Sequence, residues 1–259
     1  MTYSLLKYEL DENVAVITLN NPPANGMSPE FLFEIEDVMK NLSGDKSARA
    51  VVFTSACEGF FSAGADLSML QGVSEETLEM LPRAQAIFNA IENIPLPTVA
   101  AISGHVLGGG LELALTCDFR FMARDSGRIG LPEVRLGLIP SFGGTQRLVG
   151  IVGRGKGLEM MIKGLQLKPD DAKQIGLLTD VFEADQLMEK SMDYAHRLAK
   201  QATFAIGNIK KCVIAGARKG FERGIEEEAK AFRENIDSKD AKEGVDAFLS
   251  GRKPKFVGS

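Results

Sequence analysis

Gly108-Gly-Gly-Leu-Glu112, with Pro132-Glu133 further along the chain, is the stretch of sequence that carries the most information about this protein. Glycine lets a ligand approach the backbone closely, and the first N–H groups of a helix have no partner within that helix. Such N–H groups can bind a developing oxyanion. Two glutamates held near each other can divide acid and base work, because their repulsion raises the pKa of one of them. The stretch therefore indicates carbonyl activation beside proton transfer.

The composition indicates a globular protein that works away from membranes. The 259 residues, 44% of them hydrophobic, are enough for one large domain or two small ones. No apolar run approaches the length of about 18 residues that a membrane span needs, and the N-terminus lacks the pattern of an export signal. The net charge of −5 argues against a broadly basic surface for nucleic acid. We expect no membrane partner and no nucleic-acid partner.

Cysteine and histidine are too few and too scattered to indicate a disulfide scaffold or a metal site. Cys57, Cys117 and Cys212 are widely spaced and odd in number, which fits a reducing cytoplasm. His105 and His196 have no close cysteine or histidine neighbours in the sequence. We therefore expect a cytoplasmic protein without a zinc site.

Strand and helix signals alternate in the first part of the chain. Val14–Leu19, Ala50–Thr54 and Thr98–Ile102 are short apolar runs that predict buried strands. Ser28, followed by Pro29, predicts the start of a helix, and a longer helix is predicted over 76–94. These elements predict one layered α/β core.

Helical patterns dominate after about residue 140. Pro169 predicts a helix start and Gly176 a helix stop. Further along, apolar residues recur at helical spacing and form a stripe, here called the C-terminal stripe: Phe221, Ile225, Ala229, Phe232 and Ile236. Such a stripe packs against something, and the sequence leaves open whether that is the same subunit or a neighbour.

Two loops together indicate a binding site that neither loop indicates alone. Taken alone, the loop Phe60–Leu67 is compatible with a tight turn in which Asp66 caps the next helix. The triglycine run, taken alone, is compatible with close packing of the backbone. However, the backbone N–H groups of Ala65 and Gly109 could converge on one carbonyl oxygen. Loss of one such donor typically costs about 3 kcal/mol of transition-state stabilisation.

Several ordered motifs then carry a resemblance. They are Phe61–Leu67, Gly104–Ala114, Cys117-Asp118, Leu131–Glu133, Gly137–Pro140 and Gly143–Leu148. Through them the chain resembles the enoyl-CoA hydratase/isomerase, or crotonase, superfamily over nearly its whole length. The resemblance implies an α/β spiral core of repeated ββα units over residues 1–195. It also implies a C-terminal helical region over 196–259 that packs into a homotrimer or a dimer of trimers.

The same resemblance implies an acyl-CoA thioester as substrate, so that coenzyme A belongs to the substrate and no separate cofactor is needed. The backbone N–H groups of Ala65 and Gly109 would form the oxyanion hole. Glu112 would be the base that activates water and Glu133 the acid that protonates Cα, giving a 3-hydroxyacyl-CoA. The residues that the resemblance places beside the substrate and its coenzyme A part are Ala24, Ala63, Asp66, Leu67 and Gly108.

Other readings remain open at this point. Glu112 could be a favourable acid near a helix N-terminus, and Glu133 a solvated turn residue. Within the superfamily, an isomerase or another acyl-CoA lyase is the nearest alternative, and a noncatalytic RNA-binding relative is an alternative of another class. Ser141-Phe142 departs from the small pair frequent in the family, which could reshape the acyl pocket. Gly150–Lys156 has the spacing of a phosphate loop, but Gly157 stands where that loop needs Ser or Thr.

Overall fold

A six-stranded sheet forms the centre of the protein. The computed structural model describes residues 3–66 and 75–259, so the predicted contact residue Leu67 lies outside the described residues. The strands are arranged in the order β1-β2-β3-β5-β7-β10. β1 and β2 are antiparallel and every other neighbouring pair is parallel. Their bounds are β1 Leu6–Asp11, β2 Val14–Leu19, β3 Ala50–Ser55, β5 Thr98–Ile102, β7 Phe119–Ala123 and β10 Asp180–Phe182.

A smaller sheet of four short strands lies beside it, in the order β4-β6-β8-β9. β4 pairs with β6 and β6 with β8 in parallel, whereas β8 and β9 are antiparallel. The bounds are β4 Phe60–Ser62, β6 His105–Leu107, β8 Ile129–Gly130 and β9 Gln166–Leu167. Since β4 and β6 lead directly into the two glycine loops, this sheet brings those loops together.

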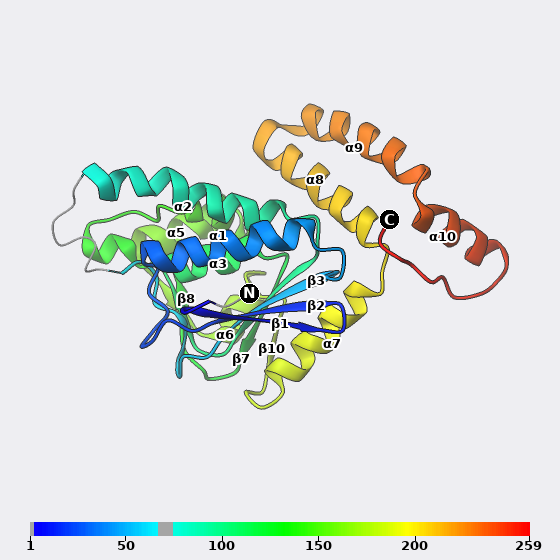
Figure 1. Ribbon diagram of the computed structural model, residues 1–259. Coiled ribbons are helices and arrows are strands. Elements are labelled where there is room, and N and C mark those ends of the chain that lie inside the picture. The colour runs from blue at the N-terminus through cyan, green and yellow to red at the C-terminus, as the bar shows by residue number, and fades with distance from the viewer. Residues whose placement is uncertain (1–2, 67–74) are drawn as a thin grey trace.

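Helices cover both faces of the large sheet, because its central strands are apolar on both sides. Alternate strand residues such as Ile17 and Phe53 pack with α1 (Pro29–Gly44), α2 (Glu75–Asn93) and α3 (Gly109–Thr116). The residues between them, such as Val16 and Val52, pack on the other face with α7 (Leu187–Ala199). Figure 1 shows α1 and α2 above the sheet and α7 below it.

α1 begins as its sequence predicts. Ser28 has an extended backbone, its side chain accepts a hydrogen bond from the Phe31 N–H at 3.3 Å, and Pro29 is the first helical residue. An N-cap of this kind satisfies a donor that the helix itself leaves unpaired. The predicted apolar face of α1 is buried: Phe31, Ile35, Val38, Met39 and Leu42.

The remaining elements of the core connect the smaller sheet to α7. They are the 3₁₀ helix η2 (Glu133–Leu136), α4 (Gly144–Val152), α5 (Arg154–Lys163) and α6 (Pro169–Gln174). α6 begins at the predicted Pro169 and ends before Gly176, which has a positive φ of 76°.

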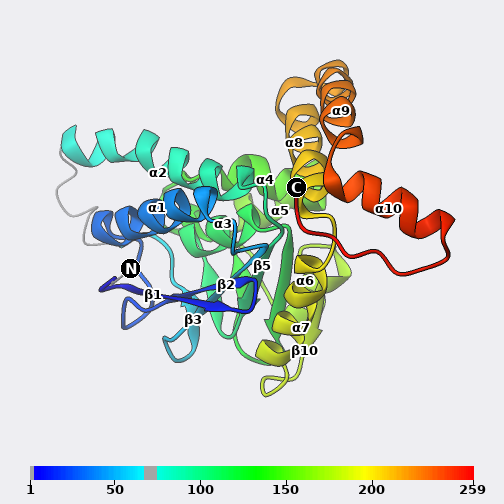
Figure 2. The same ribbon diagram turned by 45° about the vertical axis from the view of Figure 1, so that its right-hand side comes forward.

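Three helices stand away from the sheets. α8 (Thr203–Lys219) and α9 (Phe221–Ile236) form a hairpin, and α10 (Lys239–Leu249) follows it. Figure 2 shows this hairpin projecting from the core. The last residues return to the core, where Arg49 Nη1 donates to the Phe256 carbonyl at 2.9 Å.

The C-terminal stripe lies on this projecting hairpin, and its own subunit does not bury it. Phe221 is 75% exposed and Phe232 is 66% exposed. Of the residues of α9, only Ala231 is buried. The sequence left open whether the stripe packs within the subunit or on a neighbour, and within the subunit these side chains stay exposed.

The predicted α/β core with a C-terminal helical region is confirmed. The predicted boundary between residues 195 and 196 falls inside α7, and the division into two units stays a prediction. Over residues 3–66 and 75–259, no helix combines the length and the apolar character that crossing a membrane requires.

Candidate active site

A glycine turn leads from β6 into α3. β6 ends at Leu107, Gly108 follows with a φ of 52°, and α3 begins at Gly109. The Gly108 N–H donates to the Gly130 carbonyl at 3.0 Å, which ties the turn to β8. A Cβ at position 108 would also lie 3.2 Å from Glu133 Oε1. Glycine is therefore required here both by the backbone conformation and by the approach of a carboxylate.

The backbone N–H groups of Ala65 and Gly109 lie close to each other. A Cβ at Gly64 would be 2.9 Å from Gly109 N, and a Cβ at Gly109 would be 3.4 Å from Ala65 N. Among the residues that the structure describes, neither N–H donates a hydrogen bond. Two adjacent backbone donors without internal partners are the arrangement that stabilises an oxyanion.

Backbone hydrogen bonds join the loop that carries Ala65 to the segment around Ala24. The Ala63 N–H donates to the Ala24 carbonyl at 2.9 Å, and the Met27 N–H donates to the Gly64 carbonyl at 2.9 Å. Met27 and Ala65 form an isolated parallel β-bridge. Ala63 and Ala65 remain exposed, so this loop presents its small side chains outward. Asp66, the next residue, is partly buried.

Asn25 has a structural role in the same segment. Its side chain is fully buried, and its Nδ2 donates to Ser55 Oγ and to the Phe61 carbonyl, both at 2.8 Å. Its Oδ1 accepts from the Asn21 N–H at 2.7 Å. Asn25 therefore joins its own segment to β3 and β4 from inside rather than facing a ligand.

Glu112 lies on the first turn of α3 with a side chain that is almost completely buried. Its Oε1 accepts hydrogen bonds from the N–H groups of Phe142, at 2.8 Å, and Gly144, at 2.6 Å. Burial raises the pKa of Glu112, while these two N–H groups and the charge of Arg147 act in the opposite direction. Burial is the larger effect, so the pKa of Glu112 is raised overall, and the N–H groups and Arg147 limit that rise.

Glu133 begins η2, directly after Pro132, and is partly buried. Its Oε2 is shielded from solvent and has no hydrogen-bond partner in the part of the chain that is described. Burial raises the pKa of Glu133 to about 7; its own backbone N–H opposes the change, and repulsion from Glu112 adds to it. At neutral pH Glu133 therefore exists in both the protonated and the ionised form.

The two glutamates thus differ in what surrounds their oxygens. Glu112 accepts two strong backbone hydrogen bonds, whereas the buried oxygen of Glu133 accepts none from described residues. Unequal surroundings of this kind separate an acid from a base in a carboxyl pair. The structure brings together both predicted glutamates and both predicted N–H groups, on the turns that follow β4, β6 and β8.

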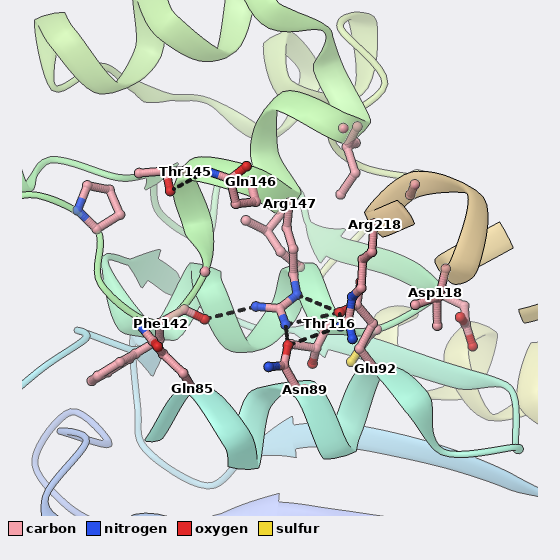
Figure 3. Close-up of a pocket in the computed structure, with 18 of the residues that line it drawn as sticks. Gln85, Asn89, Glu92, Thr116, Asp118, Phe142, Thr145, Gln146, Arg147 and Arg218 are labelled. Carbon is pink, nitrogen blue, oxygen red and sulfur yellow. Dashed lines mark hydrogen bonds and ion pairs between the residues drawn. The ribbon is translucent and has the colours of Figure 1, made fainter. Parts of the chain in front are cut away.

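A cavity of about 1010 Å³ lies next to this constellation, between α2, the end of α3, α4 and α8. Figure 3 shows its lining, which includes Glu92, Phe142 and Arg147; Glu112 and Glu133 are not among the lining residues. The ring of Phe142 packs against Phe88 with 5.2 Å between the ring centroids. A Cβ at Gly109 would lie 3.1 Å from the Phe142 ring. Phe142, expected to reshape the acyl pocket, thus stands directly beside the predicted oxyanion donors.

Other residues near the site bond to or pack against the protein itself, or are too buried to react. His105 Nδ1 accepts from the Arg128 N–H at 3.2 Å, and its ring lies against Phe60. Burial raises the pKa of Cys117 to about 12, so this cysteine remains a thiol and is unsuited to be a nucleophile. Within the described residues, His, Cys, Asp and Glu side chains form no group that could hold a metal ion.

Sequence reasoning missed one residue that contacts the site. Arg147 has a side chain only 9% exposed, and it bonds to the carbonyl of Phe142, whose N–H binds Glu112. The motif Gly143–Leu148 contains Arg147, but the motif was used only to identify a resemblance. Its partners on α2, Glu92 and Asn89, lie far away in the sequence, so local sequence does not encode these contacts.

Comparisons with known proteins find relatives over nearly the whole chain. Residues 9–259 match the family model described as enoyl-CoA hydratase/isomerase. A probable enoyl-CoA hydratase of Bacillus subtilis is 38% identical over 254 residues, covering 96% of this chain and 97% of the relative. A crotonyl-CoA hydratase of Syntrophomonas wolfei is 34% identical over 259 residues, covering 99% of each.

A solved structure of an enoyl-CoA hydratase from Bacillus anthracis superposes with a TM-score of 0.92 at 33% identity. The match covers 99% of this chain and 100% of that one. The predicted crotonase fold is thereby confirmed. By fold, by sequence and by the family model, this chain belongs to the enoyl-CoA hydratase/isomerase, or crotonase, superfamily.

Proposed function

We propose that this protein is an enoyl-CoA hydratase, which adds water across the 2,3 double bond of a 2-enoyl-CoA to give a 3-hydroxyacyl-CoA. The observation that carries the proposal is the pair Glu112 and Glu133, held in unequal surroundings beside two unpartnered backbone N–H groups. Hydration needs a base for water and an acid for carbon, and the pair supplies both.

The N–H groups of Ala65 and Gly109 would bind the thioester oxygen. As the water oxygen bonds to Cβ, the electrons of the double bond move toward the carbonyl and place negative charge on that oxygen. Donors fixed in advance stabilise this charge without reorganising, and each is typically worth about 3 kcal/mol. The backbone, rather than any side chain, would thus activate the alkene.

Glu112 would accept the proton of the attacking water, because two N–H groups and a nearby arginine support its carboxylate. Glu133, whose pKa lies at about 7, would deliver a proton to Cα as the enolate collapses. After one turnover Glu112 holds a proton and Glu133 lacks one, and proton exchange between the pair or with solvent restores the starting state. The net change is the addition of one water molecule.

The relatives' names support this reaction, since one is a crotonyl-CoA hydratase and another a probable enoyl-CoA hydratase. We also propose that the residues around the glycine loops contact the substrate and its coenzyme A part. Within this group of residues, Ala24 and Ala63 are joined by a backbone hydrogen bond, and Gly108 lies against Glu133. The set is Ala24, Ala63, Asp66, Leu67 and Gly108.

The exposed C-terminal stripe supports a further part of the proposal, assembly into a homotrimer or a dimer of trimers. Large apolar side chains are left in solvent along α9, and α10 adds Phe248 at 84% exposure. Contiguous exposed apolar surface of this kind marks interfaces between subunits. Sedimentation analysis of the purified protein tests the assembly separately from the chemistry.

One experiment distinguishes the reactions of the superfamily. Purified protein is given a short trans-2-enoyl-CoA and, separately, a 3-enoyl-CoA, and the products are identified by mass and by chromatography. We expect 3-hydroxyacyl-CoA from the first substrate. Migration of the double bond in the second without hydration of the first would instead assign an isomerase. Binding of both without turnover would assign a noncatalytic member.

Substitution of the glutamates then tests their roles. Glu112→Gln and Glu133→Gln keep the shape of each side chain and remove its acid–base chemistry. We expect each to lower kcat by about 10²-fold to 10⁴-fold, the range typical for loss of a general acid or base, with acyl-CoA binding largely retained. Full activity of either variant would refute the role of that residue.

A further inference from the structure

The side chain of Arg147 connects the glutamate site to helix α2. Its Nη1 donates to the Phe142 carbonyl at 2.8 Å, its Nε to Glu92 Oε2 at 3.0 Å, and its Nη2 to Asn89 Oδ1 at 2.7 Å. Figure 3 shows the guanidinium group pointing from α4 toward α2, with these partners around it. Three partners from three directions fix both the position and the plane of this group.

A single residue, Phe142, connects Arg147 to the Glu112 carboxylate, because its carbonyl binds Arg147 and its N–H binds Glu112. The N–H of Phe142 donates to Glu112 Oε1 at 2.8 Å, and the Gly144 N–H donates to the same oxygen at 2.6 Å. The turn of residues 141–144 therefore has Glu112 on one side and Arg147 on the other. The Phe142 carbonyl belongs to the peptide plane between the two planes that carry these N–H groups, so its bond to Arg147 restrains the backbone dihedral angles on both sides of it.

The anchor on α2 is itself reinforced from the C-terminal helices. Glu92 also pairs with Arg218 of α8, which bonds to Asn89 at 3.0 Å as well. Glu92 thus lies between two arginines, one from the core and one from the projecting hairpin. Its side chain is 23% exposed and that of Arg147 is 9% exposed, so solvent screens this pair less than a surface pair.

We propose that Arg147 is a positioning residue for the hydration step: anchored on Glu92 and Asn89, it holds the 141–144 turn so that the Phe142 and Gly144 N–H groups face the Glu112 carboxylate. The inference rests on the proposed function. It assigns to Arg147 no contact with the substrate or with the reacting atoms.

Arginine suits this task better than lysine does. Three acceptors surround one planar group, and its fixed fork of donors can meet all three at once. An ammonium group is a point charge on a flexible stem, so Arg147→Lys retains the charge while losing the fixed geometry. The charge and the geometry can therefore be tested separately.

The main test compares Arg147→Gln with wild type over a range of pH. We expect kcat to fall about 10-fold to 100-fold, the size of effect that a misplacement of about 1 Å in an active site produces, with KM within about threefold. We also expect the acid limb of the kcat profile to move up by about one pH unit, because the positive charge and the aimed N–H groups both lower the pKa of Glu112.

Two further variants make the result specific. Arg147→Lys is expected to return the acid limb toward its wild-type position while leaving kcat reduced. Arg124→Gln is the matched control, because Arg124 also bonds to two acidic side chains, Asp170 and Glu183, but on elements away from the site. We expect the control to have wild-type kinetics.

The inference is overturned if Arg147→Gln keeps wild-type kcat, or loses kcat with an unmoved acid limb, as a purely structural role would produce. It is also overturned if Arg147→Lys restores kcat completely, since charge alone would then suffice. If Arg147→Gln does not fold, Asn89→Ala removes one anchor and leaves the arginine in place. A loss of about threefold in kcat, with the limb moving up, supports the inference, and unchanged kinetics of that variant refutes it.

A spectroscopic measurement separates this inference from the proposed function. The infrared carboxyl signal of Glu112 is identified as the signal that Glu112→Gln removes, and is then titrated in wild type and in Arg147→Gln. We expect a higher midpoint in the variant. Failure of wild type to hydrate any enoyl-CoA would refute the proposed function alone, whereas equal midpoints would refute the role of Arg147 alone.

Discussion

Glu133→Gln should make the protein more stable at alkaline pH relative to wild type, at the same time as it removes activity. The pKa of Glu133 is raised from the usual 4.5 to about 7, mainly by burial. A carboxyl group with a raised pKa binds its proton more tightly in the folded state than in the unfolded state. Its contribution to stability is therefore fully present below about pH 4.5 and is lost as the pH rises to about 7.

The size of this loss follows from the two pKa values. The difference between 4.5 and about 7 corresponds to about 3.4 kcal/mol, at about 1.36 kcal/mol per unit. Glu133 is only partly buried, and solvent screens its interactions. We therefore expect about half of that value, or about 1.5 to 2 kcal/mol, as the cost of ionising Glu133 in the folded protein.

Urea unfolding at pH 5 and pH 8, at one protein concentration, measures this cost. The free energy of unfolding of wild type should decrease between the two pH values by about 1 kcal/mol more than that of Glu133→Gln, because part of the loss has already occurred at pH 5. Any constant effect of the glutamine cancels in this comparison. Glu189→Gln, at an exposed position on α7, reports what the same substitution does at a surface site. Equal pH dependence of wild type and Glu133→Gln would refute the burial argument.

Three other predictions follow from the same geometry. As the pH rises through about 7, kcat/KM should fall, because Glu133 loses the proton that it donates; a flat profile from pH 6 to pH 9 would contradict the acid role. Gly109→Ala should lower kcat about 10-fold or more, measured by the hydration assay, because the added methyl group would lie 3.1 Å from the Phe142 ring and 3.4 Å from Ala65 N. Phe232→Glu should dissociate the proposed trimer in sedimentation experiments without unfolding the subunit, because Phe232 is 66% exposed on α9; an unchanged sedimentation coefficient would contradict a role of the stripe in assembly.

The parts of the fold that the sequence predicts are those with a strong local pattern. Val14–Leu19 and Ala50–Ser55 are continuous apolar strands because helices cover them on both faces. β1, in contrast, is an edge strand with mostly polar residues, and only Leu6 of it is buried. β8 has two residues, which is too short for any periodicity to show. Both strands form because a neighbouring strand offers hydrogen bonds, and such pairing is not visible in the local sequence.

In the candidate site, too, some residues can be predicted from the local sequence and others cannot. Gly64 and Gly108 are recognisable in sequence because their backbone conformations favour glycine, whereas the roles of Glu112 and Glu133 are predicted from the motifs that carry the family resemblance. The contacts of Arg147 are different, since its partners lie 55 and 58 residues away, at Glu92 and Asn89. An arginine in an amphipathic helix is usually solvated, so the burial of Arg147 becomes apparent only when its partners on α2 are placed beside it.

Glycines allow both glutamates of the candidate site to lie directly against the backbone, and this requirement makes part of the site predictable from the sequence. A Cβ at Gly144 would lie 2.8 Å from Glu112 Oε1, and one at Gly108 would lie 3.2 Å from Glu133 Oε1. Each carboxylate therefore occupies space that any other residue would fill. The same close packing excludes water from the carboxyl groups and raises their pKa values. A substitution that loosened these turns would hydrate the glutamates and lower their pKa values, and so remove at neutral pH the protonated Glu133 on which the proposed reaction depends.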